Sequence, residues 1–201
     1  MKRYILSITG ASGPAIGVRV LGELLKVAEV HLIISRQAFF ILEEEAGIKW
    51  SAADASGVQG LLRGHFKSDR LFYWPEDDFT SPFSSGSFRT DGMLVVPCSM
   101  KTLAGISSGY GNNLTERAAD VTLKEGRPLL ISPRETPLSA IHLENMLRLA
   151  RMGVKVVPPV MGFYQKPANL DDMIGFIAGK ILDALGVEHN LYRRWGPRAP
   201  A

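Results

Sequence analysis

Arg134 and Glu135 stand side by side directly after an apolar run that ends in Pro133, and Pro137 closes the short turn behind them. The apolar run predicts a buried strand, so both charges are expected where that strand reaches the surface. An exposed ion pair in such a loop would contribute little to stability. The alternative interpretation is an active site, in which the arginine binds an anion and the glutamate transfers a proton.

The turns that follow the predicted strands share one character. Strands are predicted at residues 3–9, 29–35, 91–97, 128–133 and 154–160, and the turns at their ends read "TGASG", "SRQ", "PCSM", "PRET" and "PPVMGFY". Small hydroxyl residues, glycine and proline recur in them. Because the carboxyl ends of parallel strands meet at one edge of a sheet, these turns are predicted to converge on one ligand-binding crevice.

The glycine turn Thr9–Gly13 lies between a predicted strand and a predicted helix, which is typical of a site for a phosphate or a flavin. It is not the dinucleotide fingerprint, because Ser12 occupies a position where that motif needs glycine. The second strand is followed by Ser35 and Arg36 rather than by the acidic residue that would bind an NAD ribose. A mononucleotide therefore fits this turn better than NAD.

The order of the elements is that of an α/β protein. Helices are predicted at residues 14–27, 37–46, 100–107, 114–124, 138–152 and 171–185, and a short strand at 70–74 interrupts the least regular stretch, 63–91. This alternation predicts a Rossmann-like (flavodoxin-like) three-layer sandwich, with a mostly parallel sheet and helices on both faces. A single domain is expected over residues 1–188, followed by a basic, proline-rich C-terminal arm over residues 189–201.

Composition and charge exclude several function classes. The net charge of +3, without a stripe of Lys and Arg, speaks against nucleic-acid binding, and no apolar run approaches the length of a membrane span. The single cysteine, Cys98, leaves no internal disulfide and suits a reducing cytoplasm. The four histidines lack the spacing of metal ligands, so no metal is expected. Any chemistry is therefore expected to depend on a bound cofactor.

Several residues could take part in catalysis or ligand binding, and each also has an explanation that is purely structural. The candidates are Glu135, Arg134, Lys124, Arg117, Tyr164, Glu45 and Ser12. Arg134 and Lys124 suit a phosphate, whereas Glu135 suits proton transfer. Alternatively, Glu135 only pairs with one of these cations, and Arg117 lies on a solvated helix face. Ser99 is equally well explained as a helix N-cap.

Several long motifs together resemble one family, the flavin prenyltransferases of the UbiX type. The similarity runs nearly from end to end, through "TGASG", "SSGSFRTDGMLVVPCSM", "NNLTERAADVTLKEGRPL", "PRETPLSAIHLENM" and "GFY". The resemblance implies metal-independent transfer of a dimethylallyl group from dimethylallyl monophosphate to reduced FMN, with bonds formed first at N5 and then at C6. It also implies a homo-oligomer, commonly a dodecamer, that supplies prenylated FMN to a decarboxylase of the ubiquinone-pathway type.

The family's functional residues have counterparts in this sequence. Glu135 matches the catalytic acid, and Ser12 and Glu45 are the further catalytic candidates, Glu45 near the prenyl group. The positions that match the FMN site are Gly10, Ala11, Ser12, Ser35, Ser87, Ser99, Met100 and Arg117. The positions that match the donor site are Lys124, Arg134, Tyr164, Lys180 and the covering tryptophan, Trp195. Trp74 is either an aromatic wall of the site or an ordinary tryptophan of the core or surface.

Two positions depart from the family pattern. Ile16, after Pro14, stands where an aromatic residue is usual, and Lys180 stands where an arginine often contacts phosphate. Lysine keeps the charge but loses the bidentate fork, which bears on affinity and on the choice between a monophosphate and a diphosphate donor.

Two other functions compete with prenyl transfer. A flavin-dependent decarboxylase of cysteinyl substrates would have a histidine near the first helix and a "PxMN" motif, whereas the third long strand here ends in "PCSM". A non-catalytic FMN-binding scaffold of a decarboxylase would not need Lys124, Arg134, Glu135 and Tyr164 together.

Overall fold

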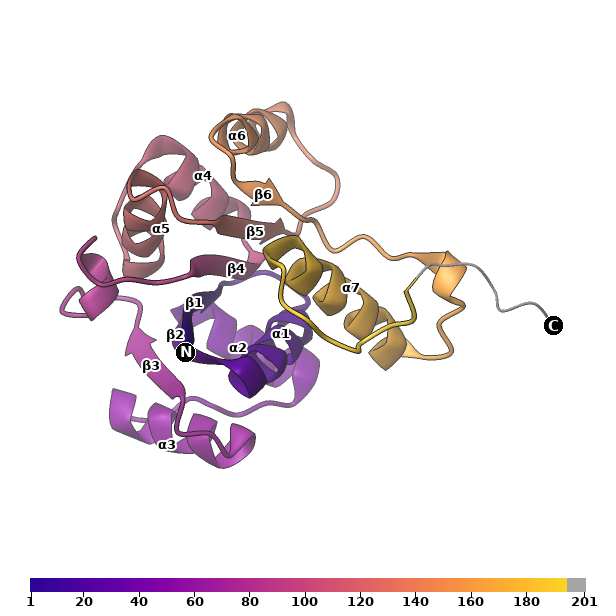
Figure 1. Cartoon of the computed structure of the whole chain (residues 1–201), viewed down its shortest axis with the longest axis horizontal. Helices are drawn as coiled ribbons and strands as arrows, with labels where there is room; N and C mark the ends of the chain where they lie inside the picture. Colours follow the sequence, from indigo (N-terminus) through magenta and orange to yellow (C-terminus); the bar gives the residue numbers. More distant parts are fainter. Residues whose placement is uncertain (195–201) are drawn as a thin grey trace.

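The computed structural model, which describes residues 1–194, contains a six-stranded parallel sheet in the order β3-β2-β1-β4-β5-β6 (Figure 1). The strands are β1 (Lys2–Ile8), β2 (Ala28–Ile34), β3 (Leu71–Pro75), β4 (Gly92–Cys98), β5 (Leu129–Pro133) and β6 (Lys155–Val156). Successive strands are added on one side of β1 up to β3, and then on its other side from β4 to β6. This is the doubly wound order of a Rossmann-like sheet, and the predicted fold class is confirmed.

Helices cover both faces of the sheet (Figure 1). One layer contains α1 (Pro14–Val27), α2 (Arg36–Ala46), α3 (Ala55–Phe66) and α7 (Leu170–Leu185). The other contains α4 (Met100–Ser108), α5 (Leu114–Lys124) and α6 (Ala140–Arg151). Two short 3₁₀ turns, η1 (Pro82–Ser84) and η2 (Phe163–Gln165), lie in the connections. In the described part of the chain, no helix is both long enough and apolar enough to cross a membrane.

The core has two parts because side chains alternate along each strand. Leu6 and Ile8 of β1 pack on the α1 side, whereas Ile5 packs on the α4 side. The central strands are apolar on both faces, as expected of a parallel sheet that has a layer of helices on each face. The sheet is thereby held rigidly enough to position the turns at its carboxyl edge.

Two elements differ from the sequence prediction. Helix α3 was not expected, because Gly57, Gly60 and Gly64 weaken its helical signal and only Val58 and Leu62 are buried on it. The strand expected at residues 154–160 shrinks to Lys155–Val156, since the prolines that follow cannot donate hydrogen bonds to a neighbouring strand.

Residues 189–194 turn back along α7. The side chains of His189, Tyr192 and Arg194 all bond to Asp183 near the end of that helix. The division of the chain at residue 188 into a domain and an arm stays a prediction, and Trp195 lies outside the described residues.

Candidate functional site

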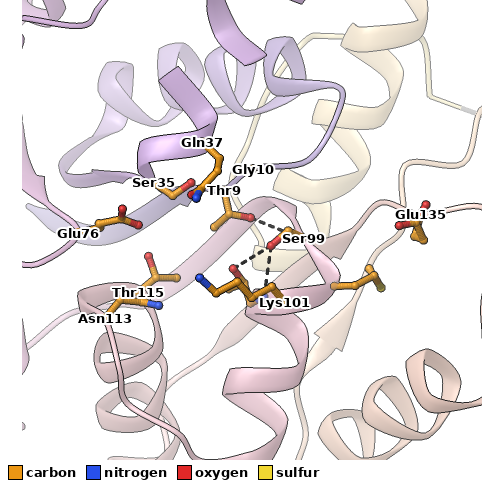
Figure 2. Close-up of a pocket in the computed structure, with 12 residues that line it drawn as sticks. Thr9, Gly10, Ser35, Gln37, Glu76, Ser99, Lys101, Asn113, Thr115 and Glu135 are labelled. Carbon is orange, nitrogen blue, oxygen red and sulfur yellow. Dashed lines mark hydrogen bonds between the residues drawn. The ribbon is translucent and has the colours of Figure 1, made fainter. Parts of the chain in front are cut away.

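A crevice of about 350 Å³ runs along the carboxyl edge of the sheet (Figure 2). Its lining comes from the turns after five strands: Thr9, Gly10, Ser35, Gln37, Glu76, Ser99, Met100, Lys101, Thr102 and Glu135, together with Asn113 and Thr115 of the α5 start. Glu76 and Ser35 lie at one end of it and Glu135 at the other (Figure 2). The predicted convergence is thus confirmed for the turns after β1, β2, β4 and β5. The turn after β6 does not line the crevice.

The centre of the crevice lies where the sheet order reverses, between β1 and β4. The Thr9 hydroxyl donates to the Pro97 carbonyl at 2.9 Å and accepts from the Ser99 N–H at 2.8 Å. Gly10 has a local reason to be glycine, because a Cβ there would lie 2.7 Å from the Cβ of Gln37. The two central turns are therefore tied together and α2 approaches them closely.

Three helices begin at this crevice. Ser35 caps α2 through the Ala38 N–H, Ser99 caps α4 through the Thr102 N–H, and Asn113 caps α5 through the Glu116 N–H. The N-cap interpretation of Ser99 is therefore confirmed, alongside its place in the crevice wall. Helix N-termini carry partial positive charge and present backbone N–H groups, so the crevice suits a ligand with a phosphate and many polar atoms.

Lys101 adds a full positive charge to the same wall (Figure 2). Sequence reasoning did not single it out, nor did it single out Glu76, Thr102, Asn113 and Thr115. A signal existed, since Lys101 directly follows the named turn "PCSM" and Glu76 follows the short strand at 70–74. Gln37 was included only as the last residue of the turn "SRQ". Applying the rule for strand ends to that short strand would have identified Glu76.

Glu135 and Arg134 stand exposed at the crevice end without an ion pair between them. One Glu135 oxygen accepts the Thr136 N–H at 2.9 Å, and the Arg134 N–H donates to the Cys98 carbonyl at 3.1 Å. Lys124 instead pairs with Glu125 at 2.6 Å. Within residues 1–194 of one chain, no ion pair joins Glu135 to either cation, so the single chain does not form the alternative ion pair.

Ser12, Ala11 and Glu45 lie around the glycine turn rather than in the crevice lining. A Glu45 oxygen accepts the Gly13 N–H at 2.9 Å, and Gly13 has the left-handed φ of 87° that favours glycine. Glu45 lines a separate groove between α1, α2 and α7. Ile16, one of the two residues that depart from the family pattern, lies on the core-facing side of α1 and is buried.

A second group of predicted residues lies along α5 and the loop that packs on it. The Arg117 guanidinium donates to the Ser84 carbonyl at 3.1 Å and pairs with Asp120, and the Ser87 hydroxyl bonds to that of Ser85 at 3.0 Å. Lys124 ends the helix whose start lines the crevice. At about 1.5 Å per residue, Lys124 lies on the order of 15 Å along α5 from the crevice end.

A third group surrounds the C-terminal helix. Tyr164, on η2, makes an edge contact with Phe176, with ring centroids 5.6 Å apart, and Lys180 is exposed on α7. Neither lines the crevice. Trp74 donates through its indole N–H to His31 and packs edge-on against Phe83, which supports the core interpretation of this tryptophan.

Comparison with known proteins assigns the family. The Flavoprotein family model matches residues 1–182. A flavin prenyltransferase UbiX of Halalkalibacterium halodurans is 47% identical over 194 residues, which cover 96% of this chain and 93% of that protein. One from Methanocaldococcus jannaschii is 46% identical, again over 96% of this chain and 98% of its own. The chain belongs to the UbiX-type flavin prenyltransferases.

Solved structures of UbiX-type proteins agree with this assignment. A dodecameric FMN-dependent UbiX-like decarboxylase from Escherichia coli O157:H7 has a TM-score of 0.85 and 46% identity, with 97% of this chain and 100% of that chain covered. AnUbiX (PadA1), in complex with FMN and dimethylallyl pyrophosphate, has a TM-score of 0.85 and 40% identity, over 98% and 99% of the chains. A PPC decarboxylase is 17% identical with a TM-score of 0.56, which shows a shared fold only.

The crevice of this UbiX-type chain fits FMN. Helix N-termini and Lys101 match the phosphate, and the hydroxyls of Thr9, Ser35 and Ser99 match a polyhydroxylated ribityl chain. Within residues 1–194, no cluster of three or more His, Cys, Asp or Glu side chains is arranged to hold a metal ion.

Proposed function

We propose that this protein transfers a dimethylallyl group from dimethylallyl monophosphate to reduced FMN, with bonds to N5 and C6. The observation that carries the proposal is near-complete alignment with flavin prenyltransferases at 46–47% identity. It is combined with a crevice whose lining ends at Glu135, directly after the exposed Arg134. Bound FMN supplies the nucleophilic ring atoms. Everything else in the reaction is the work of the chain's own side chains.

Arg134 and Glu135 have complementary roles in this proposal. The Arg134 guanidinium binds the donor phosphate bidentately and stabilises the negative charge that develops as the carbon–oxygen bond breaks. Glu135 donates a proton to the departing phosphate and afterwards accepts the proton that is lost when the second bond to the ring forms. Its carboxylate is suited to this because, among residues 1–194, only the Thr136 N–H occupies it.

The cofactor and donor residues complete the site. Gly10, Ala11, Ser12, Ser35, Ser99 and Met100 bind FMN, with Lys101 added to that set. Tyr164, Lys180 and Trp195 contribute to binding the donor, and Glu45 lies near the prenyl group through its contact with the glycine turn. A decarboxylase receives the product, and the reaction takes place in the cytoplasm.

We further propose that a second copy of the chain supplies Ser87, Arg117 and Lys124 to each site. Lys124 is separated from the crevice by the length of α5, and it lies beside the Ser84–Gly86 loop. Arg117, one turn from the crevice end of α5, contacts the same loop through the Ser84 carbonyl, and Ser87 directly follows that loop. A relative of known structure is described as dodecameric. A homo-oligomer, as in that relative, would place the second group against a neighbour's crevice.

Mass spectrometry of the flavin tests the activity directly. The purified protein is incubated without oxygen with FMN, dithionite and dimethylallyl monophosphate, and the mass of the released flavin is measured. We expect the mass of one added five-carbon prenyl unit. Tightly bound but unmodified FMN, with the diphosphate donor also tried, would contradict prenyl transfer and support the scaffold alternative.

Co-expression of two inactive variants tests the shared site. Lys124→Ala retains Glu135, and Glu135→Gln retains Lys124, so a site between the two kinds of subunit can contain both native residues. We expect each variant alone to be nearly inactive and the co-expressed mixture to recover part of the activity. If the mixture is no more active than the two variants assayed separately, one chain supplies the whole site.

A further inference from the structure

Asp183 gathers three side-chain donors from one short segment. Its Oδ1 accepts from His189 Nε2 at 3.1 Å and from the Arg194 guanidinium at 2.8 Å, and its Oδ2 accepts from the Tyr192 hydroxyl. All three donors lie within residues 189–194, which turn back along α7 after Gly186. A single carboxylate therefore holds the segment to the helix.

The packing around this carboxylate is close and directional. The His189 side chain is 1% exposed, and its Nδ1 accepts the Leu191 N–H at 3.1 Å, which places the ring proton on Nε2, facing Asp183. Gly179, one turn earlier on α7, permits the approach, because a Cβ there would lie 2.6 Å from both His189 and Tyr192. The segment thus has one well-defined position on the helix.

An aromatic row connects the segment to Tyr164. The Tyr192 ring lies 5.1 Å from that of Phe176, and Phe176 lies 5.6 Å from Tyr164 in an edge contact. The neighbouring Gln165 also donates from its side chain to the Arg193 carbonyl at 2.8 Å. The turn that carries Tyr164 is therefore supported on two sides by residues 192–193 and α7.

We propose that Asp183 is a positioning residue for the donor-binding part of the site, acting by fixing residues 189–194 so that Tyr164 is held beside α7. Lys180 precedes Asp183 by three residues on α7, so the two side chains are neighbours on the helix surface. The inference rests on the proposed function, in which Tyr164 and Lys180 bind the donor phosphate. It adds a residue that touches neither donor nor flavin.

The charge of Asp183 is what makes the attachment strong. Partial burial acts to raise the pKa of this carboxyl, but the hydrogen bonds from Arg194 and Tyr192 outweigh it and bring the pKa to about 2. Asp183 is therefore ionised at any pH at which the enzyme would be assayed. Asparagine would keep the shape but lose the charge-assisted bonds and one of the two acceptor oxygens.

The test compares Asp183→Asn with Asp171→Asn, a matched control on the same helix whose carboxylate pairs with Arg19 instead. Binding of dimethylallyl monophosphate to the FMN-loaded protein is measured by calorimetry, beside the donor KM, kcat and the Kd for FMN. We expect Asp183→Asn to weaken donor binding and raise its KM by about tenfold, while kcat and FMN affinity change less than about threefold. The control should behave as wild type.

Tryptic cleavage after Arg193 and Arg194 reports the segment itself, and should be faster in Asp183→Asn than in the control. Faster cleavage with unchanged donor binding would overturn the positioning role while leaving prenyl transfer intact. If wild type neither binds nor uses the donor, the proposed function fails and the inference with it. Should Asp183→Asn not fold, Tyr192→Phe carries the test, because it removes one donor to Asp183 and retains the ring against Phe176; unchanged donor binding there would also count against the inference.

Discussion

Asp183 and Glu135 are both carboxylates near the protein surface, but their surroundings differ. Asp183 accepts from three side chains, whereas Glu135, within the described residues, accepts one backbone N–H and stands exposed at the crevice. A carboxylate whose lone pairs are occupied by the protein can hold structure but has little capacity left for a substrate. One with unoccupied lone pairs beside an exposed arginine can bind and exchange protons.

A buried cluster on β2 and β3 follows the pattern of Asp183. His31 Nδ1 accepts from the Trp74 indole at 3.0 Å, and its Nε2 bonds to Glu29, which also pairs with Arg3. The ring is enclosed by Phe72, Trp74, Phe83 and Phe88. Both ring nitrogens of His31 have partners, so the comparison assigns this cluster to stability and the crevice edge to chemistry.

The largest expected effect is on turnover, at Glu135, the carboxylate that the described part of the chain leaves mostly without hydrogen-bond donors. Glu135→Gln removes the proton donor while keeping its size, and we expect kcat for flavin prenylation to fall by about 100-fold or more, with FMN affinity and the melting temperature unchanged. Glu144→Gln on α6, also exposed, is the matched control. A Glu135→Gln enzyme as fast as this control would remove Glu135 from the chemistry and weaken the comparison.

Substitutions in the cluster around His31 should lower the free energy of unfolding and leave turnover unchanged. His31→Phe leaves the Trp74 indole N–H without its acceptor, and we expect a loss of about 1–3 kcal/mol in the free energy of unfolding, measured by urea denaturation. His65→Phe is the control, since His65 makes ring contacts with Trp50 and Phe66. Equal stability of the two variants would show that the hydrogen bonds of His31 contribute nothing.

The same cluster predicts how stability depends on pH. Burial lowers the pKa of His31, although Glu29 opposes that shift. The neutral ring is thus favoured in the folded state, and its contribution is complete above about pH 6.5 and is lost as the pH falls toward the lowered value. We expect wild type to lose up to about 1.4 kcal/mol per pH unit on this account, and His31→Phe to show a flatter profile in urea melts between about pH 7.5 and pH 5.5. Parallel profiles would contradict the assignment.

The smallest expected effect concerns donor affinity. Lys180→Arg restores the bidentate fork usual in the family, and we expect the KM for dimethylallyl monophosphate to fall by less than about tenfold with kcat unchanged. Steady-state kinetics with the monophosphate and diphosphate donors would show whether the change favours one of them. A rise in KM for both would indicate that the lysine fits its surroundings better than the fork does.

Much of the fold was predictable because the signals were local. Alternating apolar runs and capped helices located β1, β2, β4, β5 and most helices, and their order implied a parallel sheet. Helix α3 was not predicted, because its glycines weaken the apolar periodicity and the helix depends on tertiary packing against β3. The convergence of the turns was also predictable, since it follows from the direction of parallel strands alone.

The separation of the predicted site residues into three groups was not predictable from the order of residues. Glu135, Ser35 and Ser99 meet at the crevice, Arg117 and Lys124 lie along α5, and Tyr164 and Lys180 lie at the C-terminal helix. Matching sequence motifs treats these residues as one set, because a motif contains no information about distances in the folded protein. Only the tertiary structure shows that the start of α5 lines the crevice, which leaves Lys124 on the order of 15 Å away at the other end of the helix.

The sequence by itself determined the fold class, the crevice at the carboxyl edge and the chemical types gathered there. The alternation of strands and helices implies parallel strands, and both this alternation and the residue chemistry can be identified along the chain. The tertiary structure decided which polar groups are occupied and which are open. That Asp183 is enclosed by His189, Tyr192 and Arg194 while Glu135 stays available depends on where the C-terminal segment folds back against α7. Such a fold-back leaves no periodic pattern in the sequence.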